Sequence, residues 1–140
     1  MGEDAEVRWL GHDADLRLRV RAPGAEALFA AAARAVVGAS LAEPPAGGAR
    51  RVVRLEEPDR EALLVAWLNE ILYLLSSGEF LPARFERVEI DGNVLAASLA
   101  GAPAGEKPPR FLREIKAATF HGLAVEERNG IWGATILFDI

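Results

Sequence analysis

An imidazole and two carboxylates lie close together near the start of the chain. His12, Asp13 and Asp15 precede residues 16–21, where apolar residues alternate with arginines as in a half-buried strand. Asp139 lies in a second strand-like segment, with a parity that places it opposite the apolar face. Carboxylates and backbone oxygens are ligands that calcium and magnesium prefer. These residues are compatible with a divalent-cation site, although the sequence alone favours a solvated carboxylate at Asp139.

Hydrolytic chemistry is a second interpretation of the same residues. In it, Asp13 or Asp15 polarises a water molecule beside His12. The sequence contains no nucleophile elbow, phosphate-binding loop or metal-hydrolase histidine pair to support it. His12 and His121 also fit capping or packing roles at strand ends.

Composition limits the class of protein. The chain has 140 residues, 51% of them hydrophobic, which predicts one domain over residues 1–140 with its own core. The absence of cysteine excludes disulfides, thiolate zinc sites and cysteine nucleophiles. The polar first residues and the lack of a long apolar run predict a cytoplasmic protein without membrane contact. A net charge of −5 argues against nucleic-acid binding by this chain alone.

Two helices and several strands must position these residues. Residues 24–40 have alanine-rich helical spacing with Gly38 as a candidate stop, and residues 59–77 form the most apolar helix. Asp-Gly and Asn-Gly pairs mark two hairpin turns. The expected fold is α+β: a single domain with a mostly antiparallel sheet and two main helices packed on one face. Strands are expected over residues 14–21, 51–55, 84–90 and 94–99, and on both sides of residues 129–130.

Six segments form an ordered series over nearly the whole chain. They are "HDAD", "GAEALFAAAARAV", "LLVAWLNEILYLL", "AGEK", "IKAATFHGLAV" and "GIWGATILFDI". The series resembles the archease family, whose opening motif is His-Thr-Ala-Asp and whose last strand ends in Asp-Ile. The third segment is similar to the family's most distinctive helix, Leu-Leu-x-x-Trp-Leu-Asn-Glu-Leu-Leu.

The resemblance implies an activator and not an enzyme. Archease-like proteins are cofactors of the GTP-dependent tRNA-splicing RNA ligase, and they promote its guanylylation and multiple turnover. The ligase is therefore the implied partner, with RNA reached only through it. The resemblance also implies a metal site formed by Asp15, Asp139 and a backbone oxygen of Ile140. Calcium is the ion expected there, with magnesium or manganese as alternatives.

Two positions depart from the family pattern. Asp13 replaces the threonine of the opening motif and adds a negative charge, and Phe120 replaces a tyrosine. Lys116, His121 and Glu106 match polar positions of the family, which implies contact with the partner as one role and simple surface or strand-end positions as the other. His12 and Asp13 of the opening motif are further candidates for contact with the partner or a place near the metal.

Two other functions remain open from the sequence. One is a metal-dependent hydrolase, which would turn over phosphoesters without a partner. The other is a chaperone-like protein-binding module in which the metal is purely structural.

Overall fold

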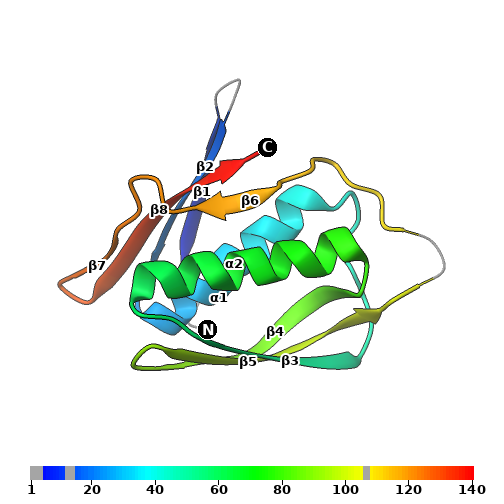
Figure 1. Ribbon diagram of the computed structural model, residues 1–140, viewed down its shortest axis with the longest axis horizontal. Helices are drawn as coiled ribbons and strands as arrows, with labels where there is room; N and C mark the ends of the chain where they lie inside the picture. Colours follow the sequence, from blue (N-terminus) through cyan, green and yellow to red (C-terminus); the bar gives the residue numbers. More distant parts are fainter. Residues whose placement is uncertain (1–4, 12–14, 106–107) are drawn as a thin grey trace.

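The structure, a computed structural model, describes residues 5–11, 15–105 and 108–140. Within this part of the chain, two helices lie between two antiparallel sheets, as Figure 1 shows. The α+β class, the single domain and the antiparallel pairing are confirmed. The strands are divided between two sheets, whereas the sequence predicted one sheet with both helices on one face.

The composition of the second helix explains the second sheet. Helix α2 spans Arg60–Ser77, and a helix that is apolar on most sides needs cover on more than one of them. Both α2 and the first helix, α1 (Ala25–Ser40), contact strands of each sheet. The buried residues of α2 are Leu63, Leu64, Val65, Trp67, Leu68, Ile71, Leu72, Leu74 and Leu75.

The first sheet carries both ends of the chain and the predicted site. Its strands, in spatial order, are β1 (Glu6–Gly11), β2 (Asp15–Ala22), β8 (Ile131–Asp139) and β6 (Ala117–Thr119), with β7 (Val125–Arg128) also paired to β8. Strand β1 was not predicted, because most of its residues are exposed and it lacks the alternating burial of its neighbour.

The second sheet is built around the Asp-Gly hairpin. Its strands, in spatial order, are β3 (Ala49–Glu56), β5 (Val94–Pro103) and β4 (Phe80–Asp91). Gly92 adopts a φ of 61° in the turn between β4 and β5, as the sequence predicted for this pair. The second predicted hairpin is also present, since Asn129 and Gly130 join β7 to β8 with φ values of 52° and 81°.

Capping chemistry defines both ends of α2, whereas α1 begins after Gly24 without a side-chain cap and is followed by Leu41 in an extended conformation. The Asp59 side chain caps α2 by accepting a hydrogen bond from the Ala62 N–H at 2.8 Å, and Gly78 ends the helix with a φ of 72°. Gly38 does not end α1, which continues to Ser40, so that prediction was wrong. The buried Ser40 hydroxyl donates to the Val36 carbonyl at 2.7 Å, which satisfies it inside the last turn. Among the described residues, no helix has the length and apolar character to cross a membrane.

Candidate metal centre

Two aspartates face each other at one end of the first sheet. In the antiparallel pairing of β2 with β8, Asp15 lies directly opposite Asp139. Residues opposed in this way project from the same face, with their Cβ atoms about 4.5–5.5 Å apart. The next pair, Leu16 and Phe138, is buried toward the helices, so both aspartates lie on the outer face. We call this end of β2 and β8, with Ile140, the acidic edge.

The two carboxylates have different surroundings. The residue Asp15 is half-buried, and its Oδ1 atom is buried with no hydrogen-bond partner among the described residues. Asp139 is exposed, and Ile140 beside it is 38% exposed. A buried carboxylate oxygen without a donor, facing a second carboxylate, carries an electrostatic cost that a cation would offset.

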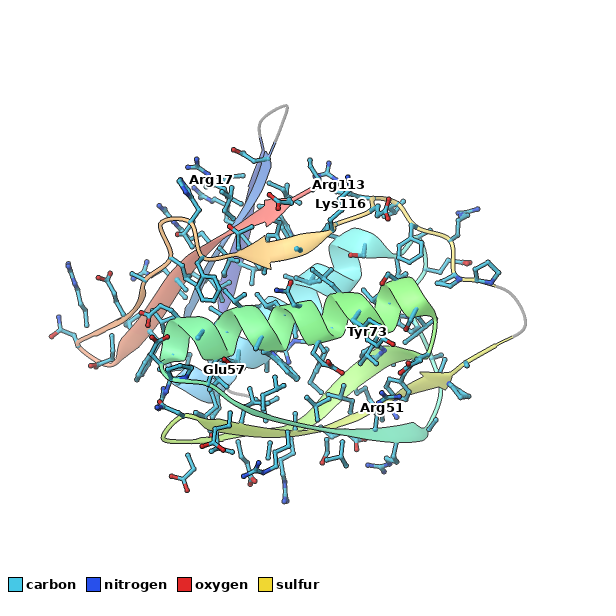
Figure 2. All side chains as sticks on the ribbon, viewed as in Figure 1. Arg17, Arg51, Glu57, Tyr73, Arg113 and Lys116 are labelled. Atoms are coloured by element: carbon cyan, nitrogen blue, oxygen red, sulfur yellow. The ribbon has the colours of Figure 1, made fainter. Side chains whose placement is uncertain are left out.

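The neighbouring strand holds the backbone of the acidic edge in place. On the side of β8 away from β2, Ala117 of β6 pairs with Asp139. On the same side, the Lys116 N–H donates to the Asp139 carbonyl at 2.8 Å. The Asp139 backbone is therefore fixed between β2 and β6, while its side chain is free of this pairing. Figure 2 labels the Lys116 side chain near the end of β8, in agreement with the backbone hydrogen bond from Lys116 to Asp139, so a cationic group borders the acidic edge.

Asn69 on α2 supports this arrangement and was not identified from the sequence. The Ala118 N–H donates to Asn69 Oδ1 at 2.7 Å, and Asn69 Nδ2 donates to the Ala118 carbonyl at 3.3 Å. One amide side chain thus satisfies both backbone groups on the open side of the short strand β6. The asparagine within a strongly apolar helix was the available signal, since a polar residue there needs a partner.

Replacing Asn69 with alanine is expected to weaken this attachment. The change leaves the Ala118 N–H and carbonyl without their partners, which should lower the free energy of unfolding by about 1–3 kcal/mol. Urea denaturation measures this loss, and hydrogen exchange should show a faster rate at the Ala118 amide. Glu70→Ala is the matched control, because Glu70 is the adjacent α2 residue with similar exposure. Equal losses in the two variants would contradict the role of Asn69.

The remaining predicted site residues lie elsewhere or are not described. His121 is exposed just beyond β6, and its backbone N–H donates to Thr119 Oγ1 at 3.3 Å. Since β6 runs away from Asp139 toward its pair with Leu137, the structure does not bring His121 to the acidic edge. The predictions for His12, Asp13 and Glu106 concern residues outside the described part of the chain.

The donor set fits a hard cation. Over the described ranges, no group of three or more histidine, cysteine, aspartate or glutamate side chains is placed to hold a metal ion. The acidic edge instead offers the two carboxylates of Asp15 and Asp139, with Ile140 next to Asp139. Calcium and magnesium bind oxygen ligands and accept water in their remaining positions, so this set suits them better than zinc.

A second polar cluster joins α2 to β3. The Tyr73 hydroxyl donates to Glu79 Oε1 at 3.0 Å, and Arg51 Nη2 donates to Glu79 Oε2 at 2.9 Å, at the lower right of Figure 2. The hydrogen bond to the Glu79 carboxylate and its negative charge raise the pKa of Tyr73. The phenol therefore stays protonated at neutral pH, and the cluster acts as a structural link between the end of α2 and β3.

The fold and the acidic edge together define a small α+β protein with a helical core between two antiparallel sheets and a pair of facing carboxylates at the end of one sheet. The chain belongs to the archease family: the model of the "Archease protein family (MTH1598/TM1083)" matches residues 8–140. The resemblance found in the sequence is thereby confirmed.

Individual relatives agree with this assignment over their full length. Protein archease of Methanosarcina mazei is 34% identical over 140 residues, covering 96% of both chains. Protein archease of Archaeoglobus fulgidus is 33% identical over 139 residues, covering 96% of this chain and 99% of the relative.

Solved structures show the same fold. The solution structure of Methanobacterium thermoautotrophicum protein 1598 superimposes with a TM-score of 0.78 at 27% identity, covering 96% of this chain and 98% of that one. A crystal structure from Thermotoga maritima, described as an archease and possible chaperone, has a TM-score of 0.62 at 18% identity over 94% of each chain.

Proposed function

We propose that this protein is a non-catalytic cofactor that activates a GTP-dependent tRNA-splicing RNA ligase. In this role it promotes guanylylation of the ligase and its multiple turnover in tRNA splicing and RNA repair, in the cytoplasm. Full-length membership of the archease family supports the choice of partner. The observation that carries the proposal is the pairing of Asp15 with Asp139, with one buried Asp15 oxygen lacking a partner among the described residues.

The acidic edge is the surface proposed to meet the ligase. The Asp15 and Asp139 carboxylates and the backbone oxygen of Ile140 would hold a divalent cation, for which calcium is our proposal. When bound, the cation supplies positive charge that offsets the repulsion between the carboxylates. Lys116 beside the edge can contact an acidic group of the partner, and its backbone keeps Asp139 in register.

Activation requires a difference in affinity between two states of the ligase. A cofactor shifts an equilibrium only by binding one state more tightly than the other. We propose that the acidic edge binds the guanylylation-ready state more tightly. The exposed position of Asp139 at the end of a strand makes it accessible to a second protein, whereas the sheet fixes the backbone positions of both aspartates.

Incorporation of labelled GTP into the ligase tests this proposal. The ligase from the same source is mixed with labelled GTP and metal, and the guanylylation rate is measured with and without this protein. A faster rate supports the proposal, and an unchanged rate contradicts it. Phosphoester turnover by this protein alone, lost in Asp15→Ala, would favour a hydrolase. Binding to many unfolded proteins without binding to the ligase would favour a chaperone-like module.

A further inference from the structure

The outer face of the first sheet, opposite the helices, is rich in arginine. In β2 the residues Leu16, Leu18 and Val20 are buried, so the alternating arginines project outward and are exposed. Strand β1, next to β2, adds Arg8, and strand β7, on the far side of β8, adds Arg128. We call these residues the arginine face: Arg8, Arg17, Arg19, Arg21 and Arg128.

No residue of the arginine face forms an ion pair within the described part of the chain. Arg8 lies directly opposite Arg19, and like charges in such a pair destabilise a sheet. Within the described ranges, the ion pairs are made by other arginines, and none involves the arginine face. Glu6 opposes Arg21 in the strand pairing without reaching ion-pair distance. An external anion would relieve the repulsion.

A groove gives this anion a place to bind. It has a volume of about 700 Å³ and lies over β8, with Gly133 and Thr135 as its floor. Arg19 and Arg21 line the groove from β2, and Arg128 lines it from β7. One carboxylate, Glu126, also lines it, so the lining includes more arginines than acids. The groove is therefore a concave, cationic surface on the outer face.

The residue type and spacing point to phosphate groups in a row. The guanidinium of arginine donates two parallel hydrogen bonds to a phosphate, which suits it to repeated phosphate contacts. Alternate residues of a strand are about 6.6–6.8 Å apart, which is comparable to the distance between successive phosphates of a nucleic-acid strand. Arg17, Arg19 and Arg21 follow this spacing along β2.

We propose that the arginine face binds the sugar–phosphate backbone of single-stranded RNA. The choice of RNA over DNA rests on the proposed function, whereas the affinity for a phosphate backbone rests on the arginine face alone. The net charge of −5 does not oppose this, because it averages over the whole chain, whereas five of the 16 basic residues lie together on this face. This proposal replaces the sequence-based expectation that RNA is reached only through the ligase.

Fluorescence anisotropy of a labelled oligouridylate tests the proposal with this protein alone, without the ligase. The affinity is measured between about 50 and 200 mM salt. The Arg19→Gln/Arg21→Gln variant removes two groove arginines. For single strands, each phosphate contact contributes about −0.7 to the slope of log affinity against log salt concentration. Loss of two contacts should therefore weaken binding and make this slope shallower by about 1.4.

Two control variants separate the groove from general charge. Arg54→Gln/Arg87→Gln makes the same charge change on exposed residues of the second sheet and should leave the affinity nearly unchanged. Gly133→Val keeps every charge but fills the floor of the groove, and it should weaken binding. A Cβ atom at Gly133 would lie 3.7 Å from its nearest neighbour, the Val20 carbonyl oxygen, which is an ordinary van der Waals distance. The variant should therefore fold.

Three results would overturn the proposal. They are no binding of oligouridylate at the lowest salt, equal weakening by both double variants, and competition by polyglutamate as strong as by RNA. The last result would assign the arginine face to an acidic protein segment. Because the ligase is absent, these outcomes are independent of whether the protein stimulates the ligase. Equally tight binding of an oligodeoxyuridylate of the same length would support contact with a phosphate backbone and contradict a preference for RNA.

Discussion

Replacing Asp15 with asparagine is expected to abolish the stabilisation of the protein by calcium. With calcium at about 100 times its Kd, binding should stabilise the wild-type protein by roughly 2.7 kcal/mol, or about 10 °C in Tm. The variant retains the shape of the side chain but loses one of the two carboxylates of the acidic edge. Its Tm should therefore change little when calcium is added.

In the presence of a chelator, the wild-type protein should no longer have the higher melting temperature of the two. Without a cation, the wild-type protein retains the repulsion between Asp15 and Asp139 and the buried Asp15 oxygen without a described partner. The neutral amide removes the repulsion and the charge on the buried atom, so the variant should melt at an equal or higher temperature. Scanning calorimetry of both proteins, with calcium and with chelator, measures the four Tm values.

The control for this experiment is Glu56→Gln. Glu56 is exposed on β3 of the second sheet, so the variant loses the same charge far from the acidic edge. It should retain the full calcium shift. A wild-type protein that folds but shows no calcium shift, or an Asp15→Asn variant with the wild-type shift, would contradict a cation site at this edge.

Truncating Trp67 should have the largest effect on folding. The indole is fully buried between the helices and the second sheet, its Nε1–H donates to the Phe29 carbonyl at 2.9 Å, and its ring lies 5.8 Å from that of Phe85. Trp67→Ala should lower the free energy of unfolding by about 3–5 kcal/mol, because the rigid helices cannot close the cavity. Urea denaturation should show a lower midpoint with a similar slope.

Trp132→Ala is the matched control for this change. Trp132 is only half-buried, and it packs beneath the Arg60 guanidinium at 5.5 Å. Its truncation should cost clearly less than that of Trp67, since part of its surface is already in contact with water. A Trp67 variant no less stable than the Trp132 variant would contradict the placement of the helical core.

Local chemistry explains which elements were predictable. The turns at Gly92 and at Asn129–Gly130 require positive φ values, and these residue types adopt them at little cost, so both hairpins follow from dipeptides. The burial of Phe138 and exposure of Asp139 follow from the period of two in a strand. Gly38 shows the limit, because packing of α1 between two sheets outweighs one glycine.

The relation between distant strands was not predictable from local pattern. Nothing near Asp15 or Asp139 determines that they oppose each other, because register depends on pairing between residues from opposite ends of the chain. The family resemblance supplied that pair as ligands, and the structure places them together. The link from Asn69 to β6 was missed for the same reason, since its partner Ala118 is far away in sequence.

Multiple-turnover RNA ligation by the ligase from the same source tests the central claim most directly. Reactions at fixed metal and GTP are compared without this protein, with the wild type, and with Asp15→Ala, Asp139→Ala or the Glu56→Gln control. The proposed function predicts stimulation by the wild type and the control, and loss of stimulation in both aspartate variants while they remain folded. Equal stimulation by folded aspartate variants would contradict the role of the acidic edge, and no stimulation by the wild type would contradict ligase activation itself.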